Sequence, residues 1–113
     1  MMAIHGDADE VVPYNGGKVW LAPVPFPSVP QWAASWAKRN RCSATPVESK
    51  RAPDLMRTEY KDCAEDASVV LYTVQGGGHQ WPGGENLPFG GTASPNLDTS
   101  NAILDFFEAH PLP

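Results

Sequence analysis

The sequence predicts an α/β fold in which parallel strands are packed by helices and joined by long loops. Residues 69–74 read VVLYTV, a near-continuous apolar run of the kind found in strands that are buried on both faces. Two segments, 28–40 and 98–110, carry apolar residues at helical spacing. The 12 prolines and 10 glycines among 113 residues indicate that much of the remaining chain is loop.

The composition is that of one small globular domain, or of a piece of a larger one, with 42% hydrophobic and 19% charged residues. The formal net charge of −5 argues against a nucleic-acid partner, whose binding surface would be basic. No stretch approaches the roughly 18 apolar residues of a membrane span. The first ten residues lack the basic start and the apolar run of a signal peptide. We therefore expect neither nucleic acid nor membrane as a partner.

The chain opens on a short apolar strand. Residues 1–4 are apolar and run directly into His5-Gly6-Asp7. Such a strand needs neighbours on both faces, so we expect the chain to be a truncated piece of a domain. After a polar loop and a turn at residues 15–17, we expect residues 22–30 to be extended or irregular, because each proline restricts the residue before it.

The clearest helix begins at Ser28. Ser28 and Gln31 form a capping box, in which each side chain can bond to the backbone N–H of the other residue. A single apolar stripe follows, made of Val29, Trp32, Ala33, Trp36 and Ala37. We expect both tryptophans to pack in the core, and Asn40 to end the helix.

The middle of the chain is polar and less regular. Residues 43–62 are broken by Pro46 and Pro53, and residues 57–61 predict a short strand that leads into Cys63. The two cysteines, Cys42 and Cys63, do not form a CxxC motif, and by themselves they fit either free thiols or a bridge.

The strand at 69–74 leads into a glycine cluster and His79. A long loop at 83–96 follows, and a final helix begins at Asp98 or Thr99 and ends at His110. Open α/β sheets place ligand sites just beyond the carboxyl ends of parallel strands, where His79 is expected. His79 therefore fits a general base, although a structural loop histidine remains an alternative. A metal-ligand role is weak, because no other His or Cys stands at ligand spacing.

A histidine base needs a carboxylate to orient it, and Asp9 is the best candidate. Asp9 also follows a short apolar strand, and it precedes His79 in the chain order of acid before base. Asp7 is a close rival for this role, but it fits a turn residue better. Considered without His79, Asp9 would also be interpreted as a turn or capping residue. Paired use of Asp7 and Asp9 in a cation site is remote, because further ligands are absent.

Four segments resemble one family of secreted esterases over nearly the whole chain. They are HGDADEVVPYNGG, SVPQWAASWAKRNRC, VVLYTVQGGGHQWPGG and DTSNAILDFFEAHP. The family is that of the polyhydroxybutyrate depolymerase-like and feruloyl esterase-like α/β-hydrolases. The resemblance implies that the fold is the C-terminal part of an α/β-hydrolase, and that the chain is incomplete.

The same resemblance implies roles for individual residues. Asp9 would be the acid and His79 the base of a Ser-His-Asp triad, and Cys42 and Cys63 would form a disulfide. Trp81 would wall the substrate cleft, although simple loop packing explains Trp81 equally well. The implied protein is a secreted carboxylic ester hydrolase of polyhydroxybutyrate depolymerase, feruloyl esterase or acetylxylan esterase type. It would act on a polyester or a plant cell-wall ester, with no metal and no organic cofactor.

One part of the family pattern is missing. No serine has a glycine two residues before it, so the chain contains no GxSxG nucleophile elbow, and it contains no HGGG-type oxyanion motif. In the family these parts lie upstream. We therefore expect residues 1–113 to be a single partial domain that lacks the nucleophile-elbow half, and that an upstream segment or a second chain completes. The alternative is a non-catalytic remnant or interaction module of the same fold.

Overall fold

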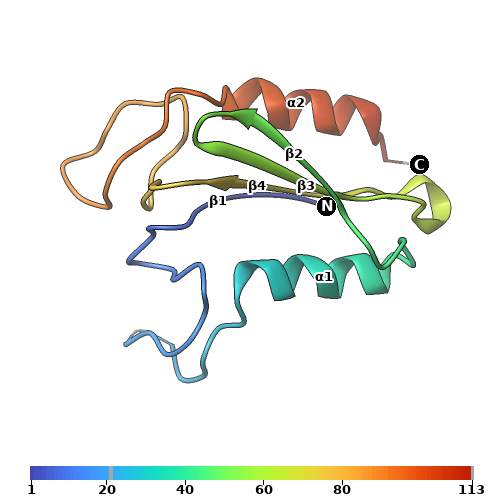
Figure 1. The fold of residues 1–113 in the computed structure, drawn as a ribbon, viewed down its shortest axis with the longest axis horizontal. Coiled ribbons are helices and arrows are strands. Elements are labelled where there is room, and N and C mark those ends of the chain that lie inside the picture. Colours follow the sequence, from blue (N-terminus) through green and yellow to red (C-terminus); the bar gives the residue numbers. More distant parts are fainter. Residues whose placement is uncertain (21, 113) are drawn as a thin grey trace.

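A four-stranded mixed sheet lies between two helices in the computed structural model, which describes residues 1–20 and 22–112. The strands β1 (Met2–Gly6), β2 (Val47–Ala52), β3 (Leu55–Tyr60) and β4 (Val69–Val74) lie in the order β1-β4-β3-β2. Helix α1 (Val29–Arg39) covers one face of the sheet and helix α2 (Thr99–Ala109) covers the other, as Figure 1 shows. A short 3-10 turn, η1 (Ala64–Asp66), precedes β4.

The expected fold class, a parallel-stranded part of an α/β-hydrolase, is wrong for this sheet. Among the described strands only β1 and β4 run parallel, whereas β3 is antiparallel to both β4 and β2. The reason is the two-residue turn at Pro53 and Asp54, which reverses the chain directly and so makes β2 and β3 antiparallel neighbours. The parallel pair is instead joined by a long crossover that contains α1.

Strand β2 was not predicted because it lies at the edge of the sheet. Its sequence, VESKRA, is mostly exposed and gives no apolar pattern. A register shift between Lys50 and Ala52 interrupts its pairing with β3. Charged residues and a bulge are features that discourage an edge strand from pairing with another chain. The strand expected at residues 57–61 is β3, which begins two residues earlier.

The predicted burial of residues 69–74 is confirmed for β4, the strand between β1 and β3. Alternate side chains of β4 point to opposite faces of the sheet. Leu71 packs with Val29 and Ala33 of the α1 layer, and Val74 packs with Leu55 and Leu97 on the opposite face. The core is therefore two thin clusters that share one central strand.

The capping box of α1 is confirmed. The Ser28 Oγ accepts from the Gln31 N–H at 3.3 Å, and the Gln31 Oε1 accepts from the Ser28 N–H at 3.3 Å. Asn40 ends the helix as expected. The prediction that both tryptophans pack in the core is wrong, because Trp32 is 40% exposed and Trp36 is only partly buried. The smaller side chains of the same stripe, Val29, Ala33 and Ala37, are the buried ones.

Helix α2 starts at the N-cap Asp98, whose side chain accepts from the Asn101 N–H at 3.1 Å. It ends at His110, the boundary that the sequence predicts. Leu104 and Phe107 on this helix are more than half exposed, at 56% and 62%. No helix in the described part of the chain is long and apolar enough to cross a membrane.

Cys42 and Cys63 form the disulfide that the resemblance implied. The bridge joins the end of α1 to the segment after β3, and thereby ties the helix layer to the sheet. Disulfides persist in oxidising compartments, so the bridge is consistent with an extracellular protein.

Replacing both cysteines, Cys42→Ser with Cys63→Ser, should lower the free energy of unfolding by about 3 kcal/mol, because the bridge closes a loop between residues 21 positions apart. Urea unfolding of the variant and of the oxidised wild type measures this difference. Wild type unfolded in the presence of a reductant is the matched control and should follow the variant. Equal midpoints for the oxidised and reduced wild type would contradict the prediction.

Candidate functional site

The loops that follow β1 and β4 meet at one end of the sheet, because these parallel neighbours place their carboxyl ends at the same edge (Figure 1). Two backbone hydrogen bonds join the loops. The Asp7 N–H donates to the Val74 carbonyl at 3.0 Å, and the Ala8 N–H donates to the Gly77 carbonyl at 3.0 Å. The segments that carry Asp9 and His79 are therefore fixed to each other.

Gly6 makes this approach possible, and Gly78 allows a second one, between the glycine cluster and the long loop. A Cβ atom on Gly6 would lie 2.0 Å from the Gly77 carbonyl oxygen, and one on Gly78 would lie 2.1 Å from the carbonyl oxygen of Gly90. Gly6, Gly77 and Gly78 are all buried. The glycine cluster before His79 thus allows backbone to pack against backbone beneath the histidine.

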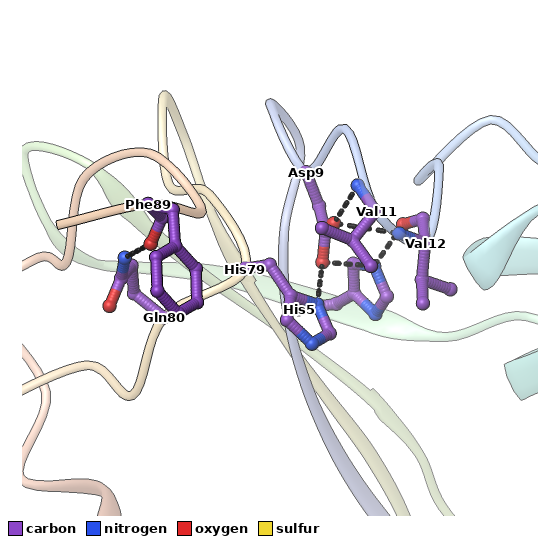
Figure 2. Close-up of polar contacts among 7 residues, drawn as sticks. All are labelled: His5, Asp9, Val11, Val12, His79, Gln80 and Phe89. Atoms are coloured by element: carbon purple, nitrogen blue, oxygen red, sulfur yellow. Dashed lines mark hydrogen bonds and ion pairs between the residues drawn. The ribbon is translucent and has the colours of Figure 1, made fainter. Parts of the chain in front are cut away.

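His79 and Asp9 form a hydrogen-bonded pair, shown in Figure 2. The His79 Nδ1 lies 2.9 Å from the Asp9 Oδ2. The carboxylate accepts, so the Nδ1 donates, and in the neutral ring the Nε2 keeps its lone pair. The Asp9 side chain is 4% exposed and that of His79 is 53% exposed. A buried acid thus orients an accessible base.

The Asp9 carboxylate is held by backbone groups of its own loop. Its Oδ1 accepts from the N–H groups of Val11 and Val12, both at 2.8 Å (Figure 2). Burial by itself raises the pKa of Asp9. The hydrogen bonds from Val12, His79 and Val11, together with the attraction of the His79 ring, outweigh burial and lower that pKa below its usual value. Asp9 is therefore held as the anion that an orienting carboxylate must be.

His5 is a third member of the cluster that sequence reasoning missed. Its Nε2 lies 2.8 Å from the Val12 carbonyl oxygen and 3.4 Å from the Asp9 Oδ2. The signal was present in the segment HGDAD, where His5 stands on the strand that precedes Asp9.

Gln80 organises the long loop that follows His79. Its Nε2 donates to the carbonyls of Phe89 at 2.5 Å and Gly91 at 3.2 Å, and its Oε1 accepts from the Leu87 N–H at 3.2 Å. Figure 2 shows the bond to Phe89 on the side of His79 away from Asp9. Sequence reasoning identified the loop but not Gln80, whose position directly after His79 was the available signal.

A cleft of about 310 Å³ opens at His79. Ile4, Trp81 and Leu87 contribute apolar lining, and His79 and Asp9 contribute polar lining. Trp81 is 55% exposed and lines the same cleft as His79. That Trp81 contacts a substrate there stays a prediction.

The rival interpretations of the polar residues find less support in the geometry. Asp7 accepts from the Gly76 N–H at 2.7 Å, as a turn residue does. Among the described residues, no group of three or more His, Cys, Asp or Glu is arranged to hold a metal ion. Within the same part of the chain no serine forms a hydrogen bond with His79, and both cysteines are in the disulfide. Among the described residues, no serine or cysteine is thus paired with His79.

The chain is similar to two esterases over part of their length. It is 30% identical to a protein of Nocardia uniformis subsp. tsuyamanensis named "Putative esterase NocK", over 94% of this chain and 36% of that protein. It is 32% identical to feruloyl esterase B of Piromyces equi, over 70% of this chain and 15% of that protein. The chain thus spans about a third of the first relative and less of the second. No family model matches it, and no solved structure does.

The ionised Asp9 should make stability depend on pH in the acid range. The pKa of Asp9 is lower in the folded protein than in the unfolded chain, where it is about 3.9. The contribution of Asp9 is thus complete above that value and is lost as the pH falls through the folded-state pKa. As the pH falls below about 4, the unfolding free energy of wild type should therefore fall more steeply than that of Asp9→Asn. Urea unfolding across this range measures the slopes, with exposed Glu10→Gln as the control for a lost charge. Parallel slopes for wild type and Asp9→Asn would disprove the ionised, hydrogen-bonded Asp9.

A methyl group at Gly6 should separate the two loops. Gly6→Ala places its Cβ against the Gly77 carbonyl, and overpacking of this kind costs about 1–3 kcal/mol. We expect His79 to lose its bond to Asp9, which imidazole ¹⁵N NMR detects as a loss of the single Nδ1–H tautomer. The control is Gly76→Ala, at a φ of 71° but in open space, which should cost stability and leave the tautomer unchanged. A Gly6→Ala protein with the wild-type His79 signals would refute the close-approach argument.

Proposed function

We propose that this chain supplies the base and the orienting acid of a serine carboxylic ester hydrolase. The observation that carries the proposal is the 2.9 Å hydrogen bond between the His79 Nδ1 and the buried Asp9, made by a histidine whose side chain is 53% exposed at a cleft. The similarity to two proteins with esterase names supports the same class of reaction. Both lines lead to acyl transfer with a histidine base.

Each residue has a defined part in the proposed reaction. The His79 Nε2 removes the proton of an attacking serine hydroxyl, and then gives that proton to the leaving alcohol. Asp9 keeps the proton of the neutral ring on Nδ1 and stabilises the imidazolium that forms. The N–H groups of Val11 and Val12 hold the carboxylate in place. Water activated by the same Nε2 then hydrolyses the acyl-enzyme.

The serine comes, in this proposal, from outside these 113 residues, either from an upstream segment or from a second chain. Two observations favour an external serine. The chain matches 36% of the Nocardia protein, and β1 stands at one end of the strand order with its outer edge open in the described structure. A further strand paired to β1 would bring new residues beside Ile4 and His5, which line the cleft. The chain is then one partial domain. The competing possibility, a non-catalytic interaction module, is favoured by the missing nucleophile alone.

The proposed substrate is an ester with an apolar acyl group. Ile4, Trp81 and Leu87 line the cleft beside His79, and Trp81 offers an aromatic face. The Piromyces relative is named a feruloyl esterase, which favours a plant cell-wall ester. A hydroxyalkanoate polyester is the alternative substrate. Methyl ferulate and a 3-hydroxybutyrate oligomer are the two probes that separate these substrates. The disulfide fits an enzyme that is secreted to reach such material.

The chain alone should not turn over p-nitrophenyl butyrate above the rate of buffer, because it lacks the nucleophile. Release of p-nitrophenol by the purified chain and by His79→Ala measures this. Circular dichroism and the intact disulfide establish that both proteins are folded. Turnover that disappears in His79→Ala would show a nucleophile within the chain or its self-associated form, and would contradict an external serine.

A chimera in which residues 1–113 replace the matching segment of the Nocardia protein should hydrolyse p-nitrophenyl butyrate. Asp9→Asn should lower its kcat by about 10⁴, the size of effect seen when an orienting Asp of a triad becomes Asn. His79→Ala should lower kcat at least as far, and His110→Ala, which alters a histidine at the end of α2, is the matched control. A folded, inactive chimera would favour the interaction module and refute the proposed function.

A further inference from the structure

We infer that His5 is a positioning residue of the proposed catalytic pair, acting through Val12 and Asp9. Its role in hydrolysis rests on the proposed function, whereas its contacts are features of the fold. His5 lies on β1, and its Nε2 is 2.8 Å from the Val12 carbonyl oxygen and 3.4 Å from the Asp9 Oδ2. Figure 2 shows His5 beside Asp9 and Val12, with His79 facing the same Asp9 oxygen, Oδ2, as His5.

Val12 is held at both of its backbone groups. Its N–H donates to the Asp9 Oδ1 at 2.8 Å, and its carbonyl accepts from the His5 Nε2 at 2.8 Å. The Asp9 carboxylate thus bonds to the Val12 N–H and closes the loop from Asp9 to Val12. The His5 side chain bonds to the Val12 carbonyl and attaches this loop to β1. Without His5, the Val12 carbonyl would lose this hydrogen bond, and the N–H groups that hold Asp9 would be less restrained.

His5 can do this because the sheet supports it. Its side chain is 19% exposed, and its ring lies against the ring of Tyr14 with centroids 5.9 Å apart. The Tyr14 hydroxyl is 2.7 Å from the Thr73 Oγ1, and Thr73 is the β4 residue paired in register with His5. A continuous set of contacts therefore runs from β4, the central strand, through Tyr14 and His5 to the Asp9 loop.

The two histidines at the cleft should occupy opposite tautomers. A carbonyl and a carboxylate can only accept, so the His5 ring must carry its proton on Nε2, and the His79 ring must carry its proton on Nδ1. His5 thus serves as a fixed donor and His79 keeps a free Nε2 for proton transfer. The same residue type has two roles because the fold offers each ring a different acceptor.

Imidazole ¹⁵N NMR of the wild-type chain tests the geometry directly, because the chain has only 3 histidines. Single substitutions of His5, His79 and His110 assign the signals. At a pH where the rings are neutral, we expect the Nε2–H tautomer for His5 and the Nδ1–H tautomer for His79. A His5 ring in the Nδ1–H tautomer would overturn the inference without any variant having to fold.

Two variants distinguish the hydrogen-bonding role of His5 from the packing of its ring against Tyr14. His5→Phe keeps a ring against Tyr14 and loses the donor, whereas His5→Gln keeps a side-chain N–H donor. In His5→Phe we expect about fivefold to tenfold faster amide exchange at Val11 and Val12, the effect of losing one hydrogen bond. We also expect a mixture of His79 tautomers, and His5→Gln should restore both readouts toward wild type. Wild-type exchange rates and a single His79 tautomer in folded His5→Phe would refute the role of His5.

His110→Phe is the matched control, because the His110 Nδ1 also bonds to a backbone carbonyl, that of Phe106, at 2.9 Å on α2. It should leave Val11, Val12 and His79 unchanged. These NMR readouts require no substrate, so they can fail while the chimera hydrolyses ester, and they can succeed while the chimera is inactive.

In an active chimera, His5→Phe should lower kcat and leave KM nearly unchanged, and His5→Gln should recover part of the loss. A fall in activity that His5→Gln does not recover would contradict a donor role.

Discussion

The contact between the backbone of Gly6 and that of Gly77 is the constraint on which the candidate site depends. It brings the ends of two parallel strands so close that a single methyl group would not fit between them. At this separation the side chains of Asp9 and His79, which are 70 positions apart in the chain, form a hydrogen bond. The rest of the sheet and both helices keep β1 and β4 in register, and thereby preserve this contact.

The electrostatics of the pair follow from the same packing. Burial would make an isolated Asp9 less acidic, but the tight loop places two backbone N–H groups on one carboxylate oxygen and His79 near the other. Hydrogen bonds to the charged form favour ionisation, and here they outweigh the cost of desolvation. The exposed edge of His79 then faces a cleft with apolar walls. A buried anion and an accessible imidazole are the arrangement that acyl transfer needs from its acid and base.

Local sequence patterns predicted those features that depend on a few neighbouring residues. The capping box at Ser28, the buried strand at 69–74, and the placement of Asp9 and His79 after two strands were all visible in this way. The direction of β2 and β3 was not, because β2 is exposed and charged and the deciding signal was a two-residue turn. The exposure of Trp32 was missed for a related reason. Helical spacing defines a stripe, but the small side chains of Ala33 and Ala37 decide which part of it meets the sheet.

We propose that the base and the acid lie in this chain and that the nucleophile lies outside it. A fluorophosphonate ester, which labels activated serines, tests this placement most directly. The label would be located by mass spectrometry in the isolated chain and in the chimera with the Nocardia protein. Our interpretation predicts no label on residues 1–113, a label on one serine of the Nocardia portion, and loss of that label in His79→Ala. A label on a residue of this chain, or labelling of the chimera that does not depend on His79, would contradict it.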